Sequence, residues 1–241
     1  MVRLMTELLY MSDSYLREFE ATVRAVEEDG VVLDKTAFYP QGGGQPSDEG
    51  TLRDQEGREY VVLKVQKVKG QVVHRLEGDP PAVGSRVQGS IDWDRRYELM
   101  RTHTALHILC GVIWRDYGAS VTGGNMQPLR ARMDFELESM SAQFSAEVEA
   151  KINQEVAAAR PVRTRILPRE EAFQIPDLIR TKINLLPEGI QEVRVVEVEG
   201  LDLQADGGTH VANTGEVGRI RVTGHESKGR INKRLRIELV E

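Results

Sequence analysis

The run from Trp93 to Tyr117 constrains the fold most, because its pattern is that of one long helix. Apolar residues recur at helical spacing, and neither proline nor glycine interrupts the run before Gly111. Asp92 stands where a helix N-cap is expected. Residues four apart share one helical face, so His103 and His107 project side by side. Such a pair can bind one metal ion, although two half-buried histidines with ordinary hydrogen bonds give the same spacing.

A second element, Asp206-Gly207-Gly208-Thr209-His210, favours the metal-site interpretation. Gly207 and Gly208 disfavour a helix, but a glycine-rich turn can fold the side chains of Asp206 and His210 toward one point. A hydrolytic zinc centre typically has three protein ligands and keeps one position for water or substrate. The candidate metal ligands are therefore His103, His107, Asp206 and His210.

Cys110 is the single cysteine of the 241 residues, so a disulfide framework is excluded and a reducing cytosol is indicated. It lies seven residues beyond His103, about 10 Å along a helix, too far to share a metal ion with both histidines. We expect it to be a small buried side chain. The chain shows no signal-peptide pattern and no apolar run near the ~20 residues of a membrane span. These features predict a cytoplasmic protein without a membrane partner, and no obligatory protein partner is evident.

The net charge of −6 argues against a general nucleic-acid binder, but the charge is uneven. Between Arg219 and Arg236 stand seven basic residues and one acidic residue. Such a strip can hold a phosphate backbone, and the alternative is a solvated sheet edge. His74 and His225 lie in no partner pattern, and we expect both at the surface.

Residues 1–90 are expected to form a small β-barrel, because several short alternating segments are separated by turn residues. The expected strands are near Phe19–Ala25 and Val31–Leu33, and at Val61–Val68, Val72–Val73 and Arg86–Ile91, with turns at Asp29-Gly30 and Lys69-Gly70.

Within this region the three glycines Gly42, Gly43 and Gly44 permit positive φ angles and a close approach to a ligand. The loop is not a P-loop, since the Lys-Ser/Thr pair is missing. It can be a loose turn, but the flanking Phe38-Tyr39-Pro40 and Gln45-Pro46 indicate a fixed shape.

Residues 91–241 are expected to form a second domain, a sheet with two long helices, which makes the fold class α+β. Gly118 and Gly123-Gly124 are expected to close the stretch that contains the histidine helix. The other expected elements are a strand at 129–137, a helix at 141–160 stopped by Pro161, a strand at 162–166, a helix at 169–180 interrupted at Pro176, and strands at 193–198, 216–222 and 231–240.

Several motifs together resemble the AlaX family of freestanding alanyl-tRNA editing proteins, which are related to the editing domains of alanyl- and threonyl-tRNA synthetases. The matching segments are Phe38 to Asp48, Arg101 to His107, Asp206 to Val211, Thr214 to Gly218 and Glu226 to Gly229. The similarity covers nearly the whole chain, with the motifs in the family's order. It implies the medium-length class, in which a translation-factor-like barrel precedes a zinc-binding editing domain.

One position departs from the family. Asp206 stands where the family usually has the cysteine of a Cys-Gly-Gly-Thr-His motif. A carboxylate oxygen also binds zinc, at about 2.0–2.2 Å, so a harder site of nitrogen and oxygen ligands is expected. The alternative is that metal is dispensable and the histidines act directly on water.

The resemblance implies hydrolysis of the ester in mischarged tRNA(Ala), most of all Ser-tRNA(Ala) and also Gly-tRNA(Ala). Candidate catalytic residues are His103, His107, Thr36 and Gln45, with Thr36 at the position thought to meet a serine hydroxyl. The candidate substrate loops are Gly42–Gly44 and Gly207-Gly208, and the candidate tRNA-binding residues are Lys228, Arg230, Lys233 and Arg234.

Two other classes remain open. A different metallohydrolase can use two helical histidines, although Thr104 stands where a peptidase would carry its glutamate. A non-catalytic RNA-binding module would explain the basic strip but not the clustered histidines. Gly43-Gly44-Gln45 also resembles the GGQ triplet of peptide-release factors, but three residues are too few to carry that interpretation.

Overall fold

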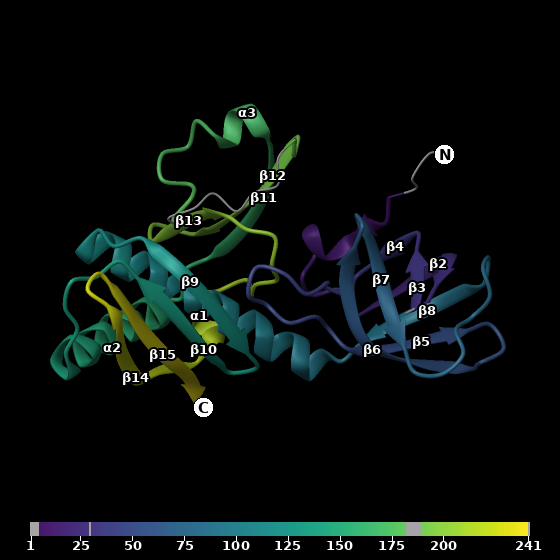
Figure 1. The fold of residues 1–241 in the computed structure, drawn as a ribbon, viewed down its shortest axis with the longest axis horizontal. Coiled ribbons are helices and arrows are strands. Elements are labelled where there is room, and N and C mark those ends of the chain that lie inside the picture. The colour runs from purple at the N-terminus through teal and green to yellow at the C-terminus, as the bar shows by residue number, and fades with distance from the viewer. Residues whose placement is uncertain (1–4, 29, 182–188, 241) are drawn as a thin grey trace. The chain divides into compact units, whose positions relative to one another are not determined.

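The computed structural model describes residues 5–28, 30–181 and 189–240, so Asp29 of the expected first turn lies outside the described residues. The chain divides into two compact units, Met1–Tyr97 and Glu98–Glu241 (Figure 1). The division falls inside helix α1 (Trp93–Tyr117) rather than before it. The helix has the bounds that its periodicity predicts. The Asp92 carboxylate accepts a hydrogen bond from the Arg95 amide at 3.2 Å, which confirms Asp92 as its N-cap.

In the first unit, six strands are hydrogen-bonded in the closed order β2-β3-β7-β6-β5-β8, and every neighbouring pair is antiparallel. These strands are β2 (Glu18–Glu27), β3 (Gly30–Leu33), β5 (Gly50–Asp54), β6 (Glu59–Val68), β7 (Gln71–Leu76) and β8 (Arg86–Ile91). Outside this barrel, β1 (Glu7–Leu8) pairs with β4 (Lys35–Thr36), and a 3-10 turn covers Leu9–Met11. The alternating segments thus predicted most of the barrel strands. Strands β1 and β4 have two residues each, and β5 has Leu52 as its single hydrophobic residue, so these three show no pattern.

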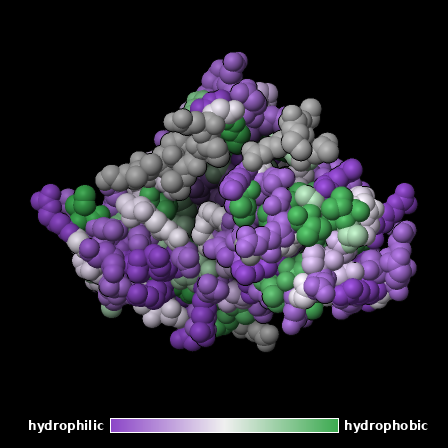
Figure 2. Space-filling model, turned by 45° about the vertical axis from the view of Figure 1, so that its right-hand side comes forward, coloured by the Kyte–Doolittle hydropathy of each residue, from purple (hydrophilic) through white to green (hydrophobic). Residues whose placement is uncertain are grey.

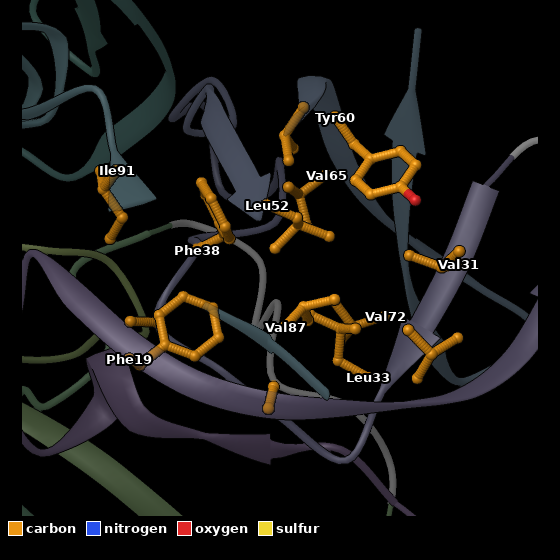
Figure 3. Packing of buried hydrophobic residues seen from close by; sticks show 14 residues of the cluster. Phe19, Val31, Leu33, Phe38, Leu52, Tyr60, Val65, Val72, Val87 and Ile91 are labelled. Atoms are coloured by element: carbon orange, nitrogen blue, oxygen red, sulfur yellow. The ribbon is translucent and has the colours of Figure 1, made fainter. Parts of the chain in front are cut away.

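The interior of the barrel is filled by the alternate side chains of its strands (Figure 3). The rings of Phe19 and Phe38 meet edge to face with their centroids 5.6 Å apart. Leu52 and Val65 are fully buried beside them. Edge-to-face packing is a favoured geometry for aromatic pairs and adds to the stabilisation from burial alone.

A buried ion pair holds the segment that leads to the glycine-rich turn. The Arg96 side chain donates from Nε to Asp48 Oδ1 at 2.8 Å and from Nη2 to Asp48 Oδ2. It also donates to the carbonyl oxygens of Ala37 and Ser14. Asp48 in turn accepts from the Tyr39 amide. Both charges are fully buried and well bonded, which is the condition under which a buried pair is tolerated.

His74 is buried inside the barrel, so its predicted surface position is wrong. Its Nε2 lies 2.8 Å from the Thr36 hydroxyl, and its Nδ1 lies 3.3 Å from the Val31 carbonyl oxygen. Strand β7 turns this residue inward because its neighbours at period two also face the core. His225, the other histidine without a pattern, is exposed as expected.

The second unit is α+β, but it contains two sheets rather than one. The four-stranded sheet has the order β14-β15-β10-β9, and the three-stranded sheet has the order β11-β12-β13. The strands are β9 (Val121–Gln127), β10 (Arg130–Phe135), β11 (Val162–Pro168), β12 (Glu192–Val198), β13 (Asp202–Ala205), β14 (Arg219–Gly229) and β15 (Asn232–Val240). The helices after α1 are α2 (Ala142–Ala157) and α3 (Arg169–Ala172), and a 3-10 turn covers Thr214–Val217.

Helix α2 covers the outer edge of β14. Its Asn153 side chain accepts from the Ile220 amide and donates to the Ile220 carbonyl, and its Glu149 accepts from the Val222 amide. Backbone groups on a sheet edge otherwise need water or another strand, so these side chains close the edge. Ser141 caps α2 through the Phe144 amide, as its sequence predicts.

Two predicted boundaries are wrong. Gly123 and Gly124 do not end a segment but lie inside β9, where they pair with Asp134 and Met133 of β10. Helix α3 ends at Ala172, well before Pro176, because hydrogen bonds of the i to i−3 type replace the helical pattern after it.

Within the described residues, no helix is long and apolar enough to cross a membrane. The face drawn in Figure 2 is mostly hydrophilic, with hydrophobic residues in separate spots. Scattered exposure of this kind is usual for a globular protein.

The stability of the barrel should depend on pH through His74. Burial lowers the pKa of His74 to about 4, against 6.5 ordinarily. The unfolded chain therefore binds the proton more readily, so stability is complete above pH 6.5 and falls as the pH drops toward 4. The gap between these two pKa values corresponds to roughly 3 kcal/mol of unfolding free energy. Unfolding free energies of the full chain, measured over this window, should fall less steeply for His74→Gln than for wild type. An equal slope in both proteins would contradict this, and His225→Gln, at an exposed histidine, is the matched control.

Candidate metal centre

Four side chains of the second unit converge on one point. His103, His107, Asp206 and His210 each present a ligand atom, and these atoms all lie within 4.8 Å of one another. The two histidines of α1 lie one turn apart, and Asp206 and His210 lie on the loop after β13. The rings of His103 and His210 are stacked with centroids 4.2 Å apart. The glycine-rich loop thus does what its sequence predicts and returns both of its ligand side chains to the helix.

The loop is held by its own backbone and by a buried arginine. The Asp206 Oδ2 atom accepts from the Gly208 amide at 2.7 Å and lies 3.0 Å from His210 Nε2. Arg194 of β12 donates from Nη1 to the carbonyl oxygens of Asp206 at 3.1 Å and Gly208 at 2.8 Å. Because Arg194 is only 4% exposed, these hydrogen bonds are shielded from water and fix the turn.

Each of these three histidines has a further polar contact on its ring. His107 Nδ1 lies 2.9 Å from Asp202 Oδ2, and His210 Nδ1 lies 3.2 Å from the hydroxyl oxygen of Thr104. His103 is bonded to the backbone of Thr209. Partners of this kind fix which ring nitrogen faces a metal ion.

Burial keeps two of the imidazoles neutral. It lowers the pKa of His103 to about 4 and that of His210 well below its usual value. Burial lowers the pKa of His107 as well, but the hydrogen bond to Asp202 and the charges of Asp202 and Asp206 together raise it above its usual value. Burial alone would raise the pKa of Asp206, but the adjacent His103 and His210 lower it further than burial raises it. A neutral imidazole and an ionised carboxylate are the forms that bind metal ions.

The donor set fits a zinc ion. Three imidazole nitrogens and one carboxylate oxygen are ordinary zinc ligands, and a tetrahedral ion with bonds near 2.0–2.2 Å needs its ligand atoms about 3.3 Å apart. The four atoms, within 4.8 Å of one another, reach that spacing with small side-chain movements. Cys110 is buried and is not among them, as expected.

The remaining predicted site residues, Thr36 and Gly42 to Gln45, lie in the first unit. Gly42 and Gln45 exchange backbone hydrogen bonds of 3.1 and 2.9 Å across Gly43 and Gly44, which both have positive φ. This is a tight two-residue turn, so the loop has a defined shape. The Gln45 side chain is buried. Thr36 is fully buried, and its hydroxyl oxygen accepts from the Phe38 amide in addition to its contact with His74.

The predicted tRNA-binding residues divide into two pairs. Lys228 and Arg230 are exposed at the turn between β14 and β15. Lys233, by contrast, is only 4% exposed, and its ammonium group donates to the carbonyl oxygens of Gly229 and Arg230. Arg234 is paired through Nε with Asp134 at 2.7 Å. Period two along β15 explains the burial, because Lys233 shares the inward face with Leu235.

Sequence reasoning missed three residues that contact the candidate ligands or their loop, namely Thr104, Arg194 and Asp202. Thr104 was visible between the two histidines, yet its side chain faces His210, more than a hundred residues away. Arg194 and Asp202 stand in strand segments, where nothing in their spacing connects them with the helix. Only the pairing of β12 with β13 beside α1 brings them to the site.

Two family models match the chain. Residues 6–95 match class II (A) tRNA synthetases, and residues 193–236 match the second additional domain of threonyl- and alanyl-tRNA synthetases. The second match contains the Asp206–His210 loop.

Curated relatives match over almost all of the chain. The alanyl-tRNA editing protein AlaX-M of Methanosarcina barkeri is 42% identical over 98% of this chain and 100% of its own length. The AlaX-M protein of Saccharolobus solfataricus is 41% identical over 96% of this chain and 98% of its own length. The alanine–tRNA ligase of Thermofilum pendens is 43% identical over 92% of this chain but only 24% of its own length. The chain therefore belongs to the AlaX-M family of alanyl-tRNA editing proteins.

Proposed function

We propose that this protein is a trans-editing hydrolase that deacylates mischarged tRNA(Ala), with Ser-tRNA(Ala) as its main substrate and Gly-tRNA(Ala) as a second one. The observation that carries the proposal is the convergence of His103, His107, Asp206 and His210 in a member of an alanyl-tRNA editing family. We place its work in the cytosol, with tRNA as its partner. We further propose that the first unit resembles a translation-factor barrel.

Such a hydrolase is needed because a synthetase pocket alone cannot reject every amino acid that resembles alanine. A synthetase pocket that accepts alanine cannot strongly exclude glycine, which lacks one methyl group, or serine, which adds one hydroxyl group. A separate site that hydrolyses the wrong ester restores the accuracy that binding alone does not supply.

The reaction needs a positioned water molecule and stabilisation of the negative charge that develops on the ester oxygen. A zinc ion at this centre supplies Lewis-acid chemistry, either toward water or toward the α-amino group of the amino acid. His103 and His210 supply neutral nitrogen donors, since burial lowers the pKa of both. Arg194 keeps the loop in place, so the donors need little rearrangement to act.

Backbone amides are the candidate partners of the developing oxyanion, and the geometry narrows the choice. The Gly208 amide already donates to Asp206 Oδ2, and the Gly42 amide donates to the Gln45 carbonyl. Gly207 is exposed on the loop next to the ligands, and a Cβ placed there would meet no atom within 4 Å. We therefore assign the oxyanion contact to the Gly207 amide, with Gly43 and Gly44 of the first unit as the alternative.

For selectivity, we propose that Thr36 accepts a hydrogen bond from the serine hydroxyl, which requires its fully buried hydroxyl group to be uncovered when substrate binds. A site built to bond a hydroxyl discriminates better than an apolar pocket. His74 Nδ1 faces a carbonyl oxygen and so carries the proton, which leaves Nε2 as an acceptor for the Thr36 hydroxyl hydrogen. Thr36 Oγ1 then keeps an acceptor lone pair besides the one used by the Phe38 amide.

For tRNA binding, we propose that Lys228 and Arg230 contact phosphates and that Lys233 and Arg234 shape the hairpin that presents them. One face of the four-stranded sheet extends this surface. On that face, arginines outnumber carboxylates among the paired residues of β10, β14 and β15. These residues are Arg130, Arg132, Asp134, Arg219, Arg221, Glu226, Arg234, Arg236 and Glu238.

The metal proposal is tested at the position that departs from the family. Purified protein should contain about one zinc ion per chain. Asp206→Cys should bind zinc at least as tightly as wild type, because a thiolate suits zinc well, and Asp206→Ala should bind it more weakly. Zinc content by elemental analysis and affinity by competition with a chromophoric chelator measure both. Equal affinity in all three proteins would remove Asp206 from the ligand set, and full activity of metal-free protein would remove the metal from the reaction.

The substrate proposal is tested by deacylation of Ser-, Gly- and Ala-tRNA(Ala). Wild type should hydrolyse Ser-tRNA(Ala) much faster than Ala-tRNA(Ala). Thr36→Val keeps the side-chain shape but leaves the substrate hydroxyl unpaired, which costs about 1–3 kcal/mol, or roughly 5- to 150-fold in the serine-to-alanine ratio. Thr51→Val, in the same barrel, controls for general effects on the unit. An unchanged ratio would place the discrimination elsewhere, and no deacylation by wild type would overturn the proposed function.

The tRNA surface is tested by charge removal. Lys228→Gln combined with Arg230→Gln should weaken binding to all tRNAs alike and reduce the salt slope by about one for each lost contact. Hydrolysis of a minimal aminoacyl ester should stay unchanged. Arg86→Gln, an exposed arginine of the first unit, is the matched control. Loss of minimal-ester hydrolysis in the double variant would show that the hairpin supports the catalytic fold instead.

A further inference from the structure

We propose that Asp202 is a positioning residue for the metal centre: it fixes the tautomer and the orientation of His107 so that Nε2 of that ring faces the other ligands. This inference rests on the proposed function, since the orientation matters only if the cluster binds a metal ion. Asp202 lies in none of the motifs that define the site in the sequence, and it reaches the site through β13.

The contact between Asp202 and His107 indicates which ring nitrogen of His107 carries the proton. Asp202 Oδ2 lies 2.9 Å from His107 Nδ1, and the Asp202 side chain has no solvent exposure. An ionised carboxylate can only accept hydrogen bonds, so His107 Nδ1 must donate. A neutral imidazole carries one N–H group, and its other nitrogen then has a free lone pair. His107 is therefore held as the tautomer whose Nε2 can bind a metal ion.

Further contacts hold Asp202 in its own place. Gln204 Nε2 donates to the same Oδ2 atom at 2.6 Å. The other oxygen, Oδ1, lies 3.8 Å from Arg180 Nε, whose guanidinium group lies over the ring of Trp114 on α1. Within the described residues, Oδ2 is thus hydrogen-bonded by both His107 and Gln204, whereas Oδ1 has only the longer ion pair with Arg180 and no hydrogen bond.

The close approach of β13 to α1 depends on Gly111, which lies one turn after His107. A Cβ atom at Gly111 would lie 2.8 Å from Leu201 Cγ, 3.0 Å from the Leu201 carbonyl oxygen and 3.1 Å from Asp202 Cβ. All three distances are shorter than ordinary contacts of a real Cβ atom. The missing side chain in α1 is therefore what allows Asp202 to reach His107.

A buried aspartate that merely joins a strand to a helix would give the same distances, so the test uses two properties that such a role would not change. The first is the tautomer of His107 in metal-free protein, read from the ring nitrogen shifts of 15N-labelled histidine, with His107→Gln for assignment. The pH must be high enough to keep His107 neutral. Wild type should show a protonated Nδ1 and a bare Nε2. A protonated Nε2 would overturn the inference without any variant.

The second property is zinc affinity. Asp202→Asn keeps the size of the side chain but loses its charge and its purely accepting character. Removing a partner of this kind typically lowers metal affinity about 10- to 100-fold, and we expect a loss in that range. Glu155→Gln is the matched control, because Glu155 is also a buried, arginine-paired carboxylate but is not paired with any of the four candidate ligands.

The outcomes separate the two proposals. If wild type binds no zinc, the metal proposal fails, while the tautomer still decides the role of Asp202. If wild type binds zinc and Asp202→Asn binds it equally well, the positioning role is wrong. Should Asp202→Asn fail to fold, Gln204→Leu leaves the carboxylate in place but removes its second donor. It should then lower zinc affinity measurably but by less than about 10-fold, and unchanged zinc affinity would overturn the inference.

Discussion

The two hydrogen bonds from Arg194 to the carbonyl oxygens of Asp206 and Gly208 are the interaction on which the site depends. The Gly-Gly sequence of the loop is flexible by itself, and glycine loses more conformational freedom on ordering than any other residue. A buried guanidinium group opposes this loss, because its bonds cannot be exchanged for bonds to water. The same positive charge lies close to the histidines and lowers the pKa of His103, which favours the neutral, ligating form. One side chain thus supplies both the shape of the loop and part of its electrostatic environment.

Helix α1 shows how much of this arrangement the sequence contains. Its bounds, its cap and its histidine pair follow from local sequence, because a long run with apolar residues at helical spacing and no proline leaves few alternatives. Strand β9 was missed because two glycines within it suggest a turn, and only pairing with β10 makes an extended conformation favourable there. The local sequence pattern therefore predicts an element well when its conformation depends on its own residues and not on a neighbouring strand.

The contacts between elements could not be predicted in this way. Asp202, Arg194 and His74 are isolated polar residues in strand segments, and their roles depend on which strand lies beside them. Lys233 and Arg230 have the same charge and lie three residues apart, yet one is buried and the other is exposed. A count of basic residues cannot distinguish them, whereas the register of β15 does so directly. The candidate ligands were found because a metal site repeats a small set of residue types, and the residues that orient them follow no such rule.

The buried polar groups of the first unit also hold a loop in place. Burying Asp48 and Arg96 costs several kcal/mol for each charge before their mutual attraction is counted, and an apolar pair of equal volume would often be as stable. The ion pair also holds the backbone in place. Arg96 donates to the Ala37 and Ser14 carbonyl oxygens, and Asp48 accepts from the Tyr39 amide. These bonds define the path of the chain on both sides of the glycine turn. Thr36, next to Ala37, is fixed in the same way by His74 and the Phe38 amide. A barrel that needed only stability would fill this space with apolar side chains, so the polar set indicates that the position of the segment 36–48 is itself what the first unit is built to maintain.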